Sequence, residues 1–368
     1  MDLQPTEEHL AVAELTRAIG LDVLAPAARK AEEERAVPDA VWRTLAETGL
    51  TVPLPEAVGG GGIPDTATQM IAVENLAYGD PGIAIAAVWG GAPALLLSRH
   101  GSPEQIANLA RLVDDPKARG AVALYEGYGR GPEEFTTTIS AEPGGTVRVK
   151  GRKVAVPFAE TADPLVVVGR DAESGALRAV HVPVPARGVT VRGTGPGLAL
   201  DAAAPATVVL DVSLPASCAI ADGDGLAGTV DRLRLAVAAA QVGTATRAVE
   251  YASEYATERV AFGRPIAGFQ GVAFPLAEAL MQIHEVRLEV TEAAVLLDED
   301  RYAEAASAVT RAVNYAGEVA AEATRTAVQT LGGHGFIQEH PVEMWYRAAA
   351  ALSALDFDPL RSAFTPAL

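Results

Sequence analysis

The chain has 368 residues, 49% of them hydrophobic, which is enough for two or three domains with substantial cores. Its 47 acidic residues outnumber its 29 basic ones, and the formal net charge of −18 excludes roles that depend on attraction to nucleic acid or anionic lipid. A single cysteine, Cys218, cannot form an internal disulfide and is interpreted as a structural thiol. Acidic residues stand where a signal peptide needs basic ones, so we expect a cytoplasmic protein.

The first region, residues 1–119, carries the signals of α-helices. Asp39 precedes an apolar stripe as a candidate N-cap, and Gly49 follows the stripe as a left-handed stop. Ser102, with Pro and Gln at the first and third positions after it, predicts a second helix start. The apolar run 83–97 is shorter than the roughly 20 residues that span a bilayer and contains Gly and Pro, so we expect a buried helix and no membrane insertion.

The periodicity changes twice after this region. From 120 to 222, short apolar runs alternate with turns rich in Pro and Gly, which predicts a small antiparallel β domain. From 223 to 368 the pattern has the period of an α-helix and predicts a bundle of four antiparallel helices. The predicted bundle helices cover 227–257, 268–298, 301–331 and 341–355.

Two polar clusters stand at the ends of the predicted bundle helices. The first contains Arg259, Phe262 and Gln270. A guanidinium can hold a pyrophosphate in two directions, and a glutamine amide can bind ribose or phosphate oxygens without adding charge. The second cluster contains Gln329, Gly332 and Gly333, where glycines allow a ligand to approach the backbone closely. Each cluster taken alone is also explained as a helix cap or a tight turn.

The segments ERVAFGRPIAGFQ (258–270) and AVQTLGGHGFIQEHP (327–341), with the order helices, sheet and bundle, resemble the acyl-CoA dehydrogenase family over nearly the whole chain. The resemblance implies an acyl-CoA dehydrogenase-like fold, an FAD cofactor, α,β-desaturation of an acyl-CoA thioester, and a separate electron-transfer acceptor. It also implies that one set of residues reaches the adenosine-diphosphate half of an FAD whose ring lies in a neighbouring subunit. These adenine-side residues are Arg259, Phe262, Gln270, Gln329, Gly332 and Gly333.

The ring-side half of the implied flavin site departs from the family pattern. Tyr125 replaces the threonine that hydrogen-bonds the flavin, and Gly131 replaces a serine near the pyrophosphate. Ala155 replaces an aromatic wall, and Pro157 replaces a hydroxyl donor and also lacks a backbone donor. Each lost hydrogen bond costs on the order of 1 kcal/mol of cofactor binding. These changes predict weak or absent ring binding by this chain.

The position of the family's catalytic glutamate falls on Asp356, counted without gaps from Gln329. The aspartate reaches roughly 1.5 Å less far, a difference that lowers a rate about a hundredfold where alignment matters. A solvated acid near a helix end is the competing interpretation of Asp356. Arg234 matches a family arginine that lines the active-site cleft, and a salt bridge or interhelical packing explains it equally well.

A chain with these departures resembles most the subunit that lacks the catalytic glutamate in the heterotetrameric acyl-CoA dehydrogenases of actinobacterial steroid degradation. We therefore expect an α2β2 assembly with a second acyl-CoA dehydrogenase-like subunit, in which this chain completes an FAD site. A self-sufficient homotetramer that uses Asp356, or Glu339 or Glu343, as base stays open, as does a cofactor-free scaffold. The six histidines show no ligand spacing, so we expect no metal catalysis.

Overall fold

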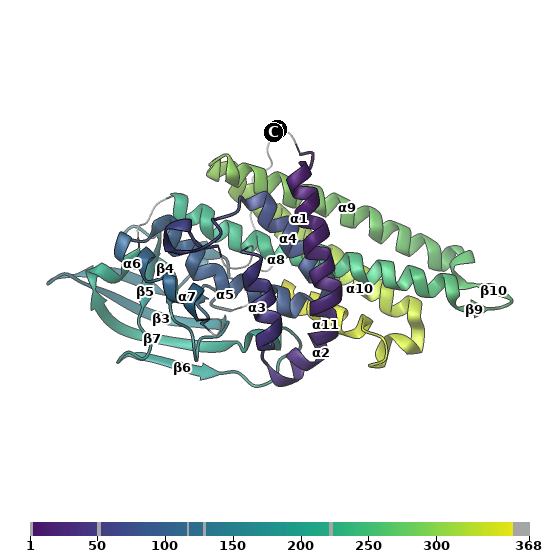
Figure 1. The fold of residues 1–368 in the computed structure, drawn as a ribbon, viewed down its shortest axis with the longest axis horizontal. Coiled ribbons are helices and arrows are strands. Elements are labelled where there is room, and N and C mark those ends of the chain that lie inside the picture. Colours follow the sequence, from purple (N-terminus) through teal and green to yellow (C-terminus); the bar gives the residue numbers. More distant parts are fainter. Residues whose placement is uncertain (1–2, 50–52, 116–117, 128–129, 221–223, 356–368) are drawn as a thin grey trace.

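The computed structural model describes residues 3–49, 53–115, 118–127, 130–220 and 224–355. N-terminal helices, a β-sheet and long C-terminal helices follow one another along the chain, in the predicted order. The sheet lies at one end of the molecule, and the long helices extend from it to the opposite end (Figure 1). The predicted domain boundaries, 119/120 and 222/223, stay predictions, and the second lies outside the described residues.

The N-terminal region consists of helices that pack on each other and on the bundle. Ser102 Oγ accepts from Gln105 N at 3.2 Å while Gln105 Oε1 accepts from Ser102 N at 2.9 Å, which is the predicted capping box. The helices are α1 (Glu7–Ile19), the π-helical η1 (Gly20–Leu24), α2 (Ala25–Glu34), α3 (Asp39–Glu47), α4 (Thr66–Gly79), α5 (Pro81–His100), α6 (Pro103–Ala107) and α7 (Ala110–Asp114), with a 3-10 turn at Glu56–Val58.

The prediction that Asp39 caps α3 is wrong by one residue. Pro38 takes the cap position with φ −55° and ψ 138°, and Asp39 is the first residue of the helix. Proline has a fixed φ that suits the residue at a helix start, and a negative charge in the first turn favours the helix dipole. Gly49 follows α3 with φ +69°, as the left-handed stop requires.

Helix α5 is the buried helix predicted from the apolar run. Every residue from Ile83 to Leu97 is buried between the sheet and the bundle. The helix is long and apolar enough to cross a membrane, but 89% of its most hydrophobic window lies inside the protein. It is therefore a core helix of a soluble fold.

The middle region is a single sheet whose strands are mostly antiparallel. Among the described residues its eight strands are ordered β6-β7-β3-β2-β4-β5-β8, and β1 pairs with β4 outside this path. Most pairs are antiparallel, as predicted, and two pairs, β1–β4 and β2–β4, are parallel. Alternation and turn residues predict strands, but they do not reveal which distant strand becomes the neighbour. The strands are β1 (Ala121–Ala123), β2 (Thr138–Glu142), β3 (Thr146–Val156), β4 (Leu165–Asp171), β5 (Leu177–Val182), β6 (Val189–Gly193), β7 (Ala206–Pro215) and β8 (Ala219–Ile220).

The C-terminal region contains the four predicted bundle helices. Small buried residues, mostly alanine, line the contact between α8 and α10. Where α8 crosses α4, a Cβ on Gly243 would lie 2.0 Å from Glu74 O, so this crossing requires glycine. The elements are α8 (Asp224–Glu258), the hairpin β9 (Val260–Ala261) and β10 (Arg264–Pro265), the 3-10 turn η6 (Ile266–Gly268), α9 (Gln270–Asp298), α10 (Tyr302–Leu331), the 3-10 turn η7 (Gly332–Phe336) and α11 (Val342–Ser353).

The start of α5 carries a buried acid, Asp80. Asp80 is 6% exposed, and its Oδ1 accepts from Ile83 N at 2.7 Å. Burial raises the pKa of Asp80 from 3.8 to about 6, against the opposing effect of the Ile83 hydrogen bond. Between about pH 4 and 6 the folded state therefore binds more protons than the unfolded state, and this group makes stability fall as the pH rises.

We expect Asp80→Asn to raise the free energy of unfolding above pH 6, by at most roughly 3 kcal/mol for a shift of about two pKa units. Asparagine keeps the oxygen that caps the helix and removes the buried charge. Urea unfolding at pH 5 and pH 8 measures the effect, with Asp65→Asn at the exposed cap of α4 as the matched control. A loss of stability in Asp80→Asn at pH 8 would contradict the prediction.

Candidate active site

The first adenine-side cluster lies on the hairpin that joins α8 to α9. Arg259 follows the last residue of α8, and Gln270 is the first residue of α9. Phe262 and Gly263 form the hairpin tip with φ 52° and 83°, the left-handed pair that closes a two-residue turn. The Phe262 side chain is 95% exposed, and Arg259 and Gln270 are exposed as well. All three side chains are thus available to a ligand outside this chain.

The second cluster lies at the end of α10. Gln329 is exposed on the last turn, and Gly332 ends the helix with φ 57° while its N–H donates to Gln329 O. A Cβ at Gly332 or Gly333 would meet no atom of the described chain within 4 Å, so a ligand can approach this backbone closely. Tyr255, near the end of α8, hydrogen-bonds His334 Nδ1 at 2.9 Å. This contact brings the second cluster beside the first.

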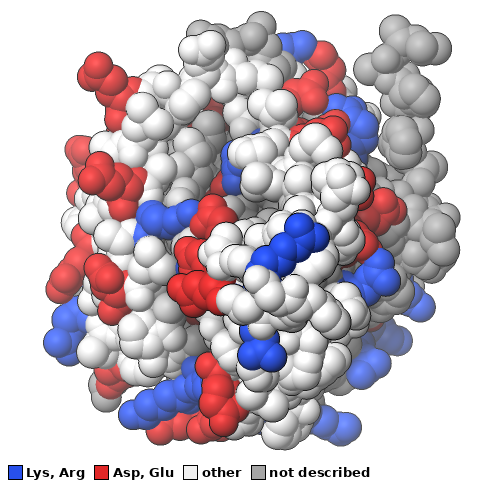
Figure 2. All heavy atoms as spheres, turned by 90° about the vertical axis from the view of Figure 1, so that its right-hand side faces the viewer, with Lys and Arg blue, Asp and Glu red and all other residues white. Residues whose placement is uncertain are grey.

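Both clusters lie at the end of the molecule opposite to the sheet, where the β9–β10 hairpin projects (Figure 1). Figure 2 views this end and shows separate basic side chains standing on a largely uncharged surface, with acidic side chains beside it. Arg259 and Arg264 supply positive charge on the hairpin of a strongly acidic chain. Exposed guanidinium and amide groups with accessible glycine backbone suit the pyrophosphate and adenosine of FAD.

The ring-side positions lie far from these clusters, between the sheet, α5 and α8. Tyr125, Ala155 and Pro157 line a small cavity together with Trp89 and Leu233. The cavity measures about 10 Å³, roughly the space that one water molecule needs. The three fused rings of a flavin are larger than this cavity. The adenine-side residues therefore fit FAD, and weak or absent ring binding by the other half-site stays a prediction.

The backbone beside this cavity is held in an unusual conformation. Ala155 and Phe158 have φ of 51° and 54°, and the pairing of β3 with β7 shifts register between Lys153 and Val156. A left-handed conformation at a residue other than glycine costs on the order of 1 kcal/mol, so the surrounding contacts must hold it. The Phe158 ring packs edge-on against Trp42 with centroids 5.7 Å apart. Ala155, which departs from the family pattern, thus lies in a tightly packed part of the sheet beside Phe158 and Trp42. We call this part the cavity wall.

A buried ion pair supports the same wall. Lys153 Nζ donates to Glu126 Oε1 at 3.0 Å and to Leu124 O at 2.8 Å, and both side chains of the pair are at most 2% exposed. Burial lowers the pKa of Lys153 to about 8. Burial alone raises the pKa of Glu126, but Lys153 and hydrogen bonds from Thr136 and Thr137 lower it to about 2. Both groups are charged at neutral pH, and each depends on the other.

The candidate catalytic and substrate-binding residues lie in different surroundings. Asp356 lies outside the described residues. Arg234 is 5% exposed and its Nη1 lies 2.7 Å from Asp231 Oδ1, so its geometry is that of the predicted salt bridge. Its predicted place in the substrate cleft stays a prediction. Glu339 is exposed in the turn before α11.

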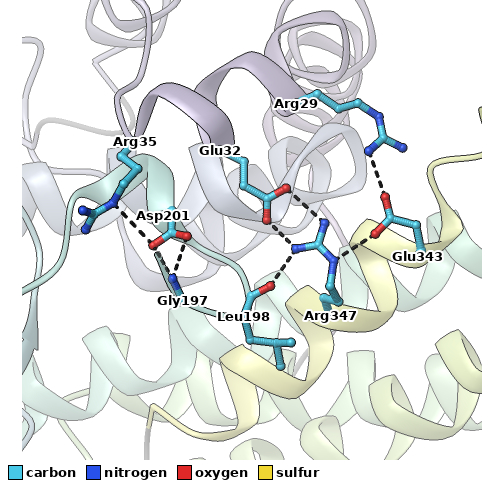
Figure 3. Close-up of polar contacts among 8 residues, drawn as sticks. All are labelled: Arg29, Glu32, Arg35, Gly197, Leu198, Asp201, Glu343 and Arg347. Carbon is cyan, nitrogen blue, oxygen red and sulfur yellow. Dashed lines mark hydrogen bonds and ion pairs between the residues drawn. The ribbon is translucent and has the colours of Figure 1, made fainter. Parts of the chain in front are cut away.

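Glu343 belongs to a polar network that joins the three regions of the chain (Figure 3). Arg347 Nε donates to Glu343 Oε2 at 2.9 Å, and its other nitrogens bind Glu32 of α2 and Leu198 O of the segment after β6. Arg29 Nη1 donates to Glu343 Oε1 at 2.9 Å. With both oxygens in ion pairs, Glu343 fastens α11 to α2, which favours a structural role over that of a catalytic base.

Sequence reasoning missed two groups of contacts near the site. One is the network of Arg29, Glu32 and Arg347, for which the sequence offers no signal because its contacts between α2 and α11 join residues 314 and 315 positions apart. The other is the bond of His334 to Tyr255, which joins residues 79 positions apart. Among the described residues, no three His, Cys, Asp or Glu side chains are placed to hold a metal ion.

A helical domain, a β domain and a helical bundle, with an exposed arginine–glutamine–glycine group on the bundle, define a class of flavin-dependent oxidoreductases. Family models agree: the N-terminal domain of acyl-CoA dehydrogenases matches residues 6–113, and the C-terminal domain matches residues 225–356. Together they cover well over half of the chain. The chain belongs to the acyl-CoA dehydrogenase family, whose members are FAD-dependent enzymes that act on acyl-CoA thioesters.

Relatives align over most of their length. The probable acyl-CoA dehydrogenase YngJ of Bacillus subtilis is 29% identical over 365 residues, which cover 95% of this chain and 94% of YngJ. Subunit CarC of the caffeyl-CoA reductase-Etf complex of Acetobacterium woodii is 29% identical and covers 86% and 85%. The structure of butyryl-CoA dehydrogenase from Megasphaera elsdenii superimposes with a TM-score of 0.83 at 26% identity, and covers 98% and 97%.

Proposed function

We propose that this chain is one subunit of a heteromeric acyl-CoA dehydrogenase and that it completes an FAD site held mainly by an unlike, catalytic subunit. The observation that carries the proposal is the contrast between the two half-sites of the chain. Its adenine-side residues are exposed and open, whereas its ring-side residues enclose about 10 Å³. The ring-side residues lie where the sheet meets α5 and the start of α8, whereas the adenine-side residues lie at the far end of α8 and α10 (Figure 1).

In the proposed assembly Arg259, Phe262, Gln270, Gln329 and the Gly332–Gly333 backbone bind the adenosine-diphosphate half of the partner's FAD. The arginine neutralises pyrophosphate charge, and the glutamines bind oxygens without adding charge. FAD, when bound, supplies the acceptor for the hydride from the acyl chain. The unlike subunit supplies the ring pocket and the carboxylate that removes the α-proton.

The finer features of the reaction belong to the same proposal. The substrate is an acyl-CoA thioester, of which a steroid side-chain CoA is our specific candidate, and the assembly is an α2β2 heterotetramer in the cytoplasm. The electron acceptor is an electron-transferring flavoprotein. The similarity to CarC, a subunit of an Etf complex, supports this choice of acceptor.

Replacement of Asp356 by asparagine in the complex with the unlike subunit tests which chain carries the base. We expect acyl-CoA-dependent flavin reduction to stay unchanged, because the base comes from the partner. Stopped-flow absorbance measures the rate, with the neighbouring Asp358→Asn as the matched control. A loss of about a hundredfold or more in rate, with FAD retained, would instead assign the base to Asp356 and support the self-sufficient alternative. A colourless, inactive complex would favour a scaffold.

A further inference from the structure

Four rings form one cluster between α8 and the turn that precedes α11. His334 and His340 stack with their ring centroids 5.4 Å apart and an interplanar angle of 12°. Tyr255 Oη lies 2.9 Å from His334 Nδ1, and Tyr251 Oη lies 2.8 Å from His340 Nδ1. The Tyr255 ring also meets His340 edge-on. We call Tyr251, Tyr255, His334 and His340 the Tyr–His cluster.

The cluster is fixed firmly on its α8 side. Tyr251 and Tyr255 are four residues apart, so they project from the same face of the helix. The Tyr251 ring packs edge-on against Trp345 of α11, whose side chain is 5% exposed, with centroids 5.5 Å apart. The backbone of Tyr255 accepts a hydrogen bond from Arg259 N at 2.8 Å. One end of the cluster is thus attached directly to the first adenine-side residue.

The other end of the cluster is attached to the glycine-rich turn η7. His334 follows Gly332 and Gly333 directly, and η7 contains Gly335 as well. Glycine backbone has the largest conformational freedom to lose on ordering. Phe336 is 76% exposed, so it does not anchor η7 in the core. The His334 side chain, in contrast, hydrogen-bonds Tyr255 and stacks on His340.

The turn after η7 is anchored separately. Arg29 of α2 donates from Nη2 to Gln338 O at 2.6 Å, and its Nη1 holds Glu343 of α11. The segment from Gly332 to His340 is therefore held at His334 and His340 by the Tyr–His cluster and at Gln338 by Arg29. A site whose parts are held in place before binding avoids the entropy cost of ordering them.

We infer that the Tyr–His cluster is a positioning element for the cofactor: it holds the Gly332–Gly333 backbone at a fixed distance from Arg259, so that one adenosine diphosphate can use both. The inference rests on the proposed function, because it concerns the FAD that this chain shares with its partner. His334 and Tyr255 do not contact the reacting atoms and act through the backbone that they position.

The test compares four variants in the complex with the unlike subunit. His334→Leu and Tyr255→Phe remove the hydrogen bond between the η7 turn and α8, whereas His334→Asn keeps an acceptor near the position of Nδ1. Tyr315→Phe is the matched control, since it removes a tyrosine hydroxyl that donates to Glu285 elsewhere in the bundle. Titration of each apo-complex with FAD, followed by flavin fluorescence, gives the dissociation constants.

We expect His334→Leu and Tyr255→Phe to weaken FAD binding roughly fivefold to tenfold, and His334→Asn and Tyr315→Phe to bind FAD like the wild type. In the chain alone, amides 332–337 should exchange hydrogen faster in His334→Leu at unchanged Tm. Unchanged FAD affinity in His334→Leu, equal losses in His334→Leu and His334→Asn, or unchanged exchange would each overturn the positioning role while the proposed function stands. A wild-type complex that binds no FAD would overturn the proposed function and this inference with it.

Discussion

Replacement of Glu126 by glutamine is expected to lower the free energy of unfolding by about 3–5 kcal/mol, the usual cost of leaving a buried charge without its partner. Lys153 is fully buried, and its ammonium group would keep Leu124 O but lose the carboxylate. The variant should also make Lys153 shed its proton more readily, because burial already lowers its pKa to about 8. Urea unfolding at pH 7 measures the loss.

The double variant Glu126→Gln with Lys153→Met is the matched control. It removes the uncompensated charge, so it should recover much of the stability that the single variant loses. In the wild type, the pKa of Glu126 falls from 4.5 to about 2 in the folded state. Its contribution is therefore present above pH 4.5 and lost as the pH falls towards 2. If Glu126→Gln alone were as stable as the wild type, the buried charge of Lys153 would not depend on Glu126, contrary to this prediction.

Arg259→Gln is expected to lower the FAD affinity of the mixed complex by about 10- to 100-fold, because a charge-assisted hydrogen bond contributes roughly 1.5–3 kcal/mol. The guanidinium is exposed at the base of the β9–β10 hairpin, so its loss should leave the fold intact. Equilibrium dialysis of FAD against the complex measures the affinity, and thermal unfolding of the chain alone checks the fold.

Arg192→Gln provides the control for charge. Arg192 is exposed on β6 in the sheet, at the other end of the molecule, and its replacement removes the same charge from the same acidic chain. FAD affinity should not change in this variant. Equal losses in the two variants would mean that net charge, and not a contact of Arg259 with the cofactor, governs binding.

Local signals explain which parts of the fold could be predicted from the sequence. The capping box at Ser102, the left-handed Gly49 and the extents of α8, α9 and α10 depend on residues close together in the chain. The parallel pairing of β1 with β4 could not be predicted, because strand patterns do not encode a distant partner. Asp39 was displaced from its cap position by the proline before it.

Local motifs likewise predicted only part of the candidate site. The adenine-side residues were predicted from two short motifs, and the structure adds that they are exposed at one end of the bundle. The Tyr255–His334 bond joins residues 79 positions apart, so no local pattern contains it. The ring-side replacements were visible in the sequence, but the closed cavity follows from packing among α5, α8 and the sheet.

The most direct test of the shared site is the flavin content of this chain, purified alone and after co-expression with an unlike acyl-CoA dehydrogenase subunit. Flavin absorbance gives the cofactor, and native mass spectrometry gives the subunit ratio. We predict no flavin in the chain alone and about half a flavin per subunit in a symmetric mixed complex. One FAD per subunit in the chain alone, reduced on addition of an acyl-CoA, would contradict the account.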